Sequence, residues 1–421
     1  MSSLSKAPAI MEKWSNFSRS DKLDGITVSE IIRIGIEANK LVTAGHDVVF
    51  LNAGEPDFPT PDNIKLSGIK AIIENKTRYT QLDGIPELKA AIKKKFLREN
   101  NLDYAVSEIS VGPGAKQVLF NVFMATLNKG DEVIVPMPCW TSYFDIIRLA
   151  GGVPVAVTCE ESNNFRITEQ QLQKAITPRT RWLLLNSPSN PTGSVYGKED
   201  LEALGQVLRQ EQHVGVVSDD IYEHIIYKNA PYQTMADVCP DLKNRIVTIN
   251  GVSKAYSMTG WRIGYAGAPQ EIIAAMAVVQ SQSSSNPCSI SQNAAVEALE
   301  GPQETIALRQ AAFCRRRDFT VAALNTLPWV SCKIPDGAFY AFANIKALLD
   351  QEDVKAKGIK NDKDLCSYLL HESKVAVVPG SCFGAEGYMR LSYATSDHLL
   401  KEALERIKVG ISQLVGVSHI K

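Results

Sequence analysis

Residues 181–219 read RWLLLNSPSNPTGSVYGKEDLEALGQVLRQEQHVGVVSD and combine two short apolar runs with a polar turn and a helix-length stretch. The runs, at 181–186 and 214–218, are apolar almost throughout and do not alternate in polarity. Such runs are typical of strands that are buried on both faces of a parallel sheet. Since 198–212 has the length of a helix, the segment predicts a strand–helix–strand unit.

The same alternation continues on both sides of this unit. Short apolar runs recur at 131–136 and 245–250, and helix-length stretches occupy 116–127, 271–281 and 289–299. Strand and helix therefore alternate through the middle of the chain. This order predicts an α/β class, with a mostly parallel central sheet that is covered by helices on both faces.

The last third of the chain has a different pattern. A long helical stretch is followed by short strand-like runs and a final helix, which predicts a second, smaller α+β domain. The expected elements are a helix at 305–324, strands at 338–343, 375–379 and 388–393, and a helix at 396–414. We interpret the basic runs 93–95 and 315–317 as solvated helix faces.

Composition excludes several classes of protein. The 421 residues are 45% hydrophobic and 22% charged, which excludes a disordered or fibrous chain. A net charge of −1 provides no basic field for nucleic acid or an anionic membrane surface. The longest apolar run, 272–279, is far shorter than the roughly 18 residues of a membrane span. The cysteines form no Cys-x-x-Cys pair and the N-terminus lacks a signal-peptide core, so we expect reduced thiols in a cytoplasmic protein.

Polar residues follow three of the predicted strands at the points where they end. Asn190 lies in a turn after one strand, and Asp219 and Tyr222 follow the next. Lys254 follows the run at 245–250. In open α/β sheets, ligands bind in a crevice at the carboxyl ends of the strands. We therefore expect these four side chains to meet in one crevice.

A glycine turn precedes the helical stretch at 116–127. It reads GPGAKQ at 112–117, and its glycines allow a phosphate to approach the backbone N–H groups of the helix N-terminus. Arg262, in TGWRIG at 259–264, is a residue type suited to a bidentate phosphate clamp. The turn matches neither a complete dinucleotide fingerprint nor a P-loop, and most such sequences are simply tight turns.

Three longer stretches carry a family resemblance. They are SKAYSMTGWRIGY at 253–265, NSPSNPTG at 186–193 and NAGEPDF at 52–58. From about residue 24 to the C-terminus the chain resembles the class I aminotransferases, which are pyridoxal 5'-phosphate (PLP) enzymes of fold type I. The branch that it most resembles is the bacterial-type aspartate and aromatic aminotransferases. We expect an N-terminal extension at 1–23, a small domain made of 24–63 and 313–421, and a large PLP-binding domain at 64–312.

The resemblance implies a role for each polar residue of the crevice. Lys254 would form a Schiff base with the PLP aldehyde and shuttle a proton at the substrate α-carbon. Asp219, rather than its neighbour Asp220, would keep the pyridine nitrogen protonated. Tyr222 and Asn190 would hydrogen-bond the phenolic oxygen. The other cofactor-binding residues would be Gly114, Ala115, Ser253 and Arg262, with Trp140 stacked on the ring.

The resemblance also implies substrate contacts. Arg390 lies in a strand-like run where a buried charge is costly, and it would bind the substrate α-carboxylate beside Gly54. Trp140 and Asn190 would contact the substrate as well. Tyr79 would reach the phosphate of a neighbouring subunit, which implies a homodimer with shared active sites. The alternatives are packing roles for Trp140 and Tyr79.

Lys116 is the sharpest clue to the substrate. It follows the glycine turn, and a similar lysine in aspartate-specific relatives meets the side-chain carboxylate; the alternative is an exposed lysine in the first turn of a helix. Animal-type aspartate enzymes place an arginine shortly before a Ser-Asn-Pro motif, but residues 281–284, before SNP at 285–287, contain none. We expect aspartate or glutamate as the donor and 2-oxoglutarate or oxaloacetate as the acceptor, with an aromatic aminotransferase as the alternative.

Two further functions stay open because a fold does not fix a reaction. A PLP-dependent lyase or cyclising synthase would keep the fold and the cofactor, and a PLP-binding sensor would bind without turnover. The six histidines have none of the spacings of a metal site, so we expect no metal.

Overall fold

A seven-stranded sheet forms the centre of the computed structural model, which describes residues 18–227 and 232–416. The strand order is β2-β8-β7-β6-β5-β3-β4. The pairs from β4 to β7 are parallel, and β8 is antiparallel to both of its neighbours. The strands are β2 (Ile109–Gly112), β3 (Glu132–Met137), β4 (Val153–Thr158), β5 (Thr180–Asn186), β6 (Gly215–Asp219), β7 (Ile246–Gly251) and β8 (Gly264–Gly267). The predicted, mostly parallel α/β sheet is confirmed.

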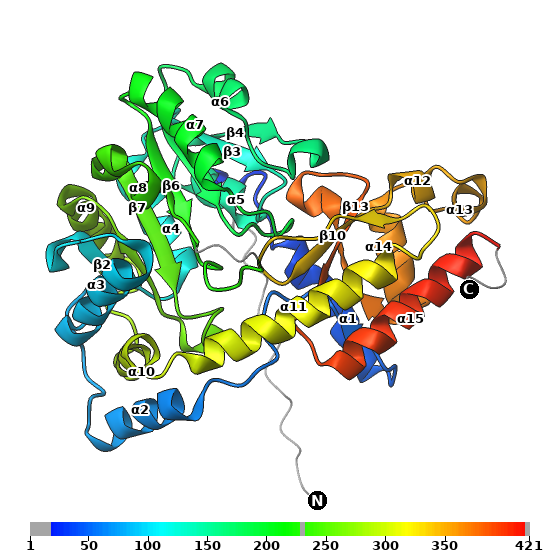
Figure 1. Ribbon diagram of the computed structural model, residues 1–421, viewed down its shortest axis with the longest axis horizontal. Coiled ribbons are helices and arrows are strands. Elements are labelled where there is room, and N and C mark those ends of the chain that lie inside the picture. The colour runs from blue at the N-terminus through cyan, green and yellow to red at the C-terminus, as the bar shows by residue number, and fades with distance from the viewer. Residues whose placement is uncertain (1–17, 228–231, 417–421) are drawn as a thin grey trace, which may run out of the picture.

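The apolar runs form strands because both faces of the sheet are buried. In β5, Leu183 and Leu185 enter one hydrophobic core, and Trp182 and Leu184 enter another. Since neighbouring residues of a strand point to opposite faces, each face needs its own layer of helices. One core includes α3 (Pro86–Asn100), α6 (Glu169–Ala175), α7 (Lys198–Gln210), α8 (Met235–Val238) and α10 (Ser289–Glu300), and the other includes α4 (Ala115–Thr126), α5 (Ser142–Leu149) and α9 (Gln270–Ser281) (Figure 1).

The last third of the chain builds a separate, antiparallel sheet of four strands in the order β12-β13-β10-β9 (Figure 1). A two-stranded parallel sheet joins β1 (Val49–Phe50) to β11 (Val375–Ala376). Residues 375–379, predicted as one strand, divide at Val377 between two sheets. The remaining elements are β9 (Ser331–Cys332), β10 (Tyr340–Asn344), β12 (Val378–Pro379), β13 (Tyr388–Ser392), α1 (Glu30–Thr43), α2 (Asp62–Ile73), α11 (Glu304–Leu324), α12 (Lys346–Leu349), α13 (Glu352–Ala356), α14 (Asp362–His371) and α15 (Asp397–Leu414).

We propose the division of the chain into a large domain (64–312) and a small domain (24–63 with 313–421) on the basis of shared cores. Val49 and Leu51 pack in one core with residues of the last third, including Leu404. The helix α11 continues through residue 313, and in Figure 1 it extends from the side of the large sheet across to the smaller four-stranded sheet. Of the predicted N-terminal extension, residues 1–17 lie outside the described part of the chain. Among the described residues, no helix is long and apolar enough to cross a membrane.

Candidate active site

A cavity of about 250 Å³ lies at the carboxyl ends of the parallel strands. The strands β5, β6 and β7 end at its wall, as expected for an open α/β sheet. Eleven of the predicted site residues line it: Gly54, Ala115, Lys116, Trp140, Asn190, Asp219, Tyr222, Ser253, Lys254, Arg262 and Arg390. Gly114 directly precedes Ala115 at the start of α4.

Lys254 follows β7 and extends across the cavity. Its Nζ donates a hydrogen bond of 2.6 Å to the carbonyl oxygen of Gly54, which comes from the segment after β1. Burial lowers the pKa of Lys254 to about 8. A lysine with that pKa is partly neutral near pH 7, so its amine can act as a nucleophile or accept a proton.

Asp219 is the last residue of β6 and is 3% exposed. The Tyr143 hydroxyl donates to its Oδ2 at 2.7 Å, and the Ile221 N–H donates to its Oδ1 at 3.4 Å. Burial raises the pKa of Asp219 to about 6. The neighbouring Asp220 is absent from the cavity wall and accepts a hydrogen bond of 2.6 Å from Ser218 Oγ. The geometry therefore favours Asp219 as the acid that faces a ligand.

Tyr222 joins the two larger sheets at the cavity. Its hydroxyl lies 2.7 Å from the hydroxyl of Tyr340, the first residue of β10. Burial raises the pKa of Tyr222 well above its ordinary value, so the hydroxyl stays neutral and can donate. The Lys254 Nζ lies 5.7 Å from the centre of the Tyr222 ring.

Arg390 in β13 is a buried cation, 1% exposed. Its Nη1 donates to Asn190 Oδ1 at 2.8 Å and its Nη2 to the Asn52 carbonyl at 2.6 Å, while its Nε has no hydrogen-bond partner among the described residues. The guanidinium lies over the rings of Tyr340 and Phe383, at 4.5 and 4.9 Å. Within residues 18–227 and 232–416, no carboxylate forms an ion pair with it. A buried charge without a counter-ion is expensive, so this site suits an anionic ligand group.

The start of α4 and Arg262 form an anion cradle. Gly114 caps the helix with a φ of +93°, and a Cβ there would lie 2.2 Å from Arg262 Nη2. Arg262 itself has a φ of +57°, a conformation that residues other than glycine rarely adopt. Its Nη1 donates to the Thr259 carbonyl at 2.8 Å. Free helix N–H groups and a guanidinium together suit a phosphate.

Lys116 lies in the first turn of α4 and faces the cavity. Its Nζ is 4.7 Å from the centre of the Trp140 ring. Partial burial lowers the pKa of Lys116, and the nearby Arg262 charge adds to that effect. Trp140 also packs edge-to-face on Tyr143, with ring centres 5.4 Å apart. Trp140 thus lines the cavity and packs against the core at the same time.

Tyr143, Asn186 and Tyr340 line the cavity but were not predicted as site residues. The Asn186 Oδ1 accepts the Asn190 N–H at 2.9 Å, and its Nδ2 donates to the Asp219 carbonyl at 2.9 Å, so it links the loop after β5 to the end of β6. Its place at a strand end within NSPSNPTG was a usable signal. The two tyrosines belong to no local motif, and the fold alone brings them to the site.

Tyr79 lies away from the cavity and is 91% exposed. Its predicted contact is with the phosphate site of another subunit. That role stays a prediction.

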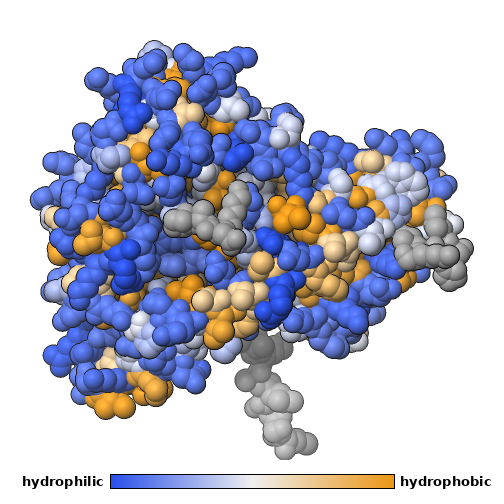
Figure 2. Space-filling view, in the orientation of Figure 1, coloured by the Kyte–Doolittle hydropathy of each residue, from blue (hydrophilic) through white to orange (hydrophobic). Residues whose placement is uncertain are grey.

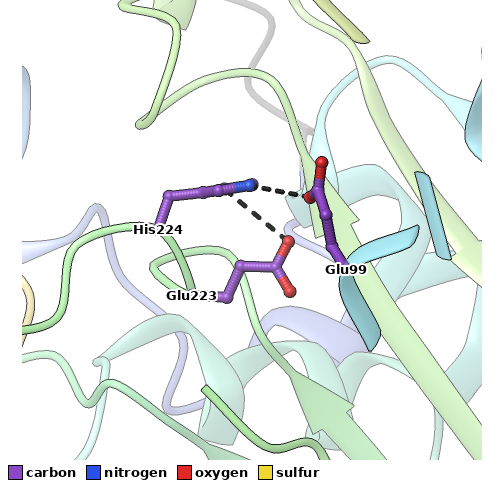
Figure 3. A group of neighbouring side chains, drawn as sticks. All are labelled: Glu99, Glu223 and His224. Carbon is purple, nitrogen blue, oxygen red and sulfur yellow. Dashed lines mark hydrogen bonds and ion pairs between the residues drawn. The ribbon is translucent and has the colours of Figure 1, made fainter. Parts of the chain in front are cut away.

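A second group of charged residues follows Tyr222 in the chain, where Glu223 and His224 face Glu99 near the end of α3 (Figure 3). In the described part of the chain, this is the single cluster of potential metal ligands, with Glu99 as its third member. Lys95 donates to Glu223 Oε1 and, at 2.7 Å, to Asn100 Oδ1. Because the buried Lys95 ammonium already pairs with both carboxylates, we interpret the cluster as an internal ion network.

This network corrects one expectation from the sequence. Lys95 lies in the run 93–95, predicted as a solvated helix face, but it is 0% exposed. Arg316, in the run 315–317, is also buried and pairs with Asp57 and Asp397 at 2.7 Å each. The prediction was wrong for these two residues because acids from distant parts of the chain lie opposite them.

Comparison with known proteins identifies similar chains. The family described as "Aminotransferase class I and II" matches residues 46–407. The crystal structure of the aspartate aminotransferase from Rhizobium meliloti has a TM-score of 0.91 and 52% identity, covering 94% of this chain and 99% of that one. The aspartate aminotransferase from Thermus thermophilus with maleate has a TM-score of 0.87 and 41% identity, covering 94% and 100%. An aspartate/prephenate aminotransferase of Cereibacter sphaeroides is 50% identical, covering 92% of this chain and 97% of its own length.

Proposed function

The chain belongs to the class I and II aminotransferases, and from that premise we propose that it transfers the amino group of aspartate or glutamate to a 2-oxo acid such as 2-oxoglutarate, using PLP. The observation that carries the choice of substrate is a pair of cations at one cavity, Arg390 and Lys116. Each is placed to accept one carboxylate of a dicarboxylic substrate. The names of the three relatives, all of which include aspartate, support the proposal.

The cavity residues fit PLP. The cradle of Gly114 and Arg262 suits its phosphate, the buried Asp219 suits its ring nitrogen, and Lys254 suits its aldehyde. Further contacts would come from Ala115, Trp140, Asn190, Tyr222 and Ser253. When bound, PLP supplies an aldehyde that takes up the amino group and a ring that withdraws electrons.

The protein supplies orientation and proton transfer. Arg390, held by Asn190, would bind the substrate α-carboxylate next to Gly54, and Lys116 would bind the side-chain carboxylate. Lys254 would then take the proton from the substrate α-carbon, because its pKa of about 8 leaves a neutral amine available.

We further propose a homodimer with shared active sites. The helix α2 exposes Leu66, Ile69, Ile72 and Ile73, which are 51–73% exposed. Figure 2 shows hydrophobic side chains at the lower edge of the molecule, where α2 lies. A contiguous apolar face of this kind suits a second copy of the chain, and the exposed Tyr79 lies in the segment that follows α2.

A cytoplasmic location belongs to the same proposal. All eight cysteines are free, and five of them are buried as thiols. This pattern is typical of a protein that folds in a reducing compartment.

An absorption spectrum tests the proposal. Purified holoenzyme receives single amino acids without any 2-oxo acid, and the cofactor band and the released oxo acid are measured. Aspartate should convert the cofactor stoichiometrically to its amine form and release oxaloacetate. Conversion by aromatic amino acids alone would instead favour the aromatic alternative, which the apolar Ile31 and Leu119 at the cavity wall support. A lyase or a sensor would leave no stoichiometric amine form, and a protein without PLP affinity would defeat the cofactor assignment.

A further inference from the structure

Asp219 depends on a neighbour to which the proposed function gives no role. Tyr143 in α5 is 2% exposed, and its hydroxyl donates a hydrogen bond of 2.7 Å to Asp219 Oδ2. Among the described residues, Asp219 has no ion pair with a lysine or an arginine. Its other hydrogen bond, from the Ile221 N–H, is long at 3.4 Å. The tyrosine hydroxyl is therefore the main hydrogen-bond donor to this carboxylate.

The same side chain supports a second part of the site. The Tyr143 ring packs edge-to-face on Trp140, with centres 5.4 Å apart and planes at 88°. The hydroxyl and the ring of Tyr143 thus act on two different residues of the cavity wall. A substitution that removes only the hydroxyl therefore tests the hydrogen bond to Asp219 and leaves the packing on Trp140 in place.

We propose that Tyr143 is a positioning residue that orients the Asp219 carboxylate and favours its ionised form, and so strengthens binding of the protonated pyridine ring of PLP. The part that concerns PLP rests on the proposed function. The mechanism is direct: a hydroxyl that donates to a carboxylate stabilises the ionised acid. An ionised acid at this position in turn stabilises a protonated ring nitrogen.

In the described part of the chain, three ionisable groups face Asp219 from the surrounding elements. They are Tyr143 from α5, Tyr222 from the loop after β6, and Lys254 from the segment after β7. Tyr222 stays neutral because burial raises its pKa. The charge of Lys254 lowers the pKa of Asp219, and it does so whether or not Tyr143 has a hydroxyl. The effect of the Tyr143 hydroxyl on the pKa of Asp219 can therefore be measured separately from the effect of the Lys254 charge.

The test compares two variants that each lose one buried hydroxyl. Tyr143→Phe removes the donor to Asp219 and keeps the ring against Trp140. Tyr104→Phe is the matched control, because Tyr104 is 1% exposed, bonds Thr248 Oγ1 at 3.2 Å and is absent from the cavity wall. The pKa of Asp219 is measured in the PLP-free protein by carbon-13 NMR of labelled aspartate, with Asp219→Asn to assign the signal.

Tyr143→Phe should raise the pKa of Asp219 by about one unit and weaken the affinity for PLP about tenfold, whereas Tyr104→Phe should change neither. Incorporation of 3-fluorotyrosine at position 143 makes the hydroxyl a stronger donor and should lower the pKa of Asp219; it also serves as the test if the Phe variant does not fold. An unchanged Asp219 pKa in both Tyr143 variants, or an equal shift in the control, overturns the proposal. A wild-type protein that binds no PLP defeats the proposed function, while normal wild-type binding with unchanged affinity in Tyr143→Phe overturns this inference alone.

Discussion

The loop after β6 has two sides, and its buried charges differ between them. On the cavity side, Asp219 and Tyr222 face Arg390 and Lys254 across a space, and Arg390 has no carboxylate partner among the described residues. On the opposite side, the next residue, Glu223, is equally buried, but it accepts a hydrogen bond from Lys95 and lies beside His224 and Glu99 (Figure 3).

The difference shows how a binding site can be told from a structural ion network. Both sides contain buried, ionisable residues, so burial alone does not separate them. Behind the loop, His224 and the charge of Lys95 lower the pKa of Glu99 to about 2, although burial opposes them. In the cavity, burial moves the pKa of Lys254 and of Asp219 towards neutrality. Buried charges without an oppositely charged partner inside the protein mark the place where a ligand can supply that partner.

The largest loss of activity should come from a substitution on the cavity side of the loop. Lys254→Ala should reduce kcat at least about 10⁴-fold, because it removes both the nucleophilic amine and the group that moves the α-proton. Lys198→Ala, at an exposed lysine at the start of α7, is the control and should keep wild-type activity. Turnover is measured by coupling oxo-acid release to a dehydrogenase. Wild-type turnover in Lys254→Ala would remove the basis for calling this side catalytic.

On the opposite side of the loop, substitutions should change the stability of the protein much more than its activity. Lys95→Met leaves the Glu223 carboxylate buried without its ammonium partner, so the free energy of unfolding should fall by about 3–5 kcal/mol. The double variant Lys95→Met with Glu223→Met removes both charges and should lose less than the single variant. Urea denaturation of the PLP-free protein measures both, and KM of the folded single variant should stay within a few fold of wild type. A near-neutral Lys95→Met, or strictly additive losses, would contradict the interpretation as an ion network.

The same two sides explain what the sequence can reveal. The cavity side is encoded in local motifs: an apolar strand followed by a polar residue at its carboxyl end predicts both the fold and Asp219, Asn190 and Lys254. The network side carries no local signal. Lys95 lies in a run of three lysines that fits a solvated helix, and its acid partner Glu223 is far away in the sequence.

Tyr143 and Tyr340 show the same limit within the cavity itself. Neither belongs to a motif, and each is recognised through a contact, with Asp219 in one case and Tyr222 in the other. Such contacts depend on how α5 and β10 pack, and a single sequence does not specify that packing. Local sequence patterns therefore identify the residues at strand ends but not those that hold them in place.

Lys116 follows a sequence motif, the glycine turn, but its role depends on a contact with Trp140. Its substitution should give the smallest of these effects. As a side-chain anchor, it predicts that Lys116→Ala lowers kcat/KM for aspartate about 10- to 100-fold through a higher KM and leaves phenylalanine almost unchanged. Lys116→Met is the matched control, because it keeps an apolar stem over Trp140 and loses only the charge. If the charge binds the substrate, the Met and Ala variants should lose aspartate activity alike. Equal losses for aspartate and phenylalanine, or wild-type behaviour in the Met variant, would assign Lys116 to packing on Trp140 and leave Arg390 as the cation that meets the substrate.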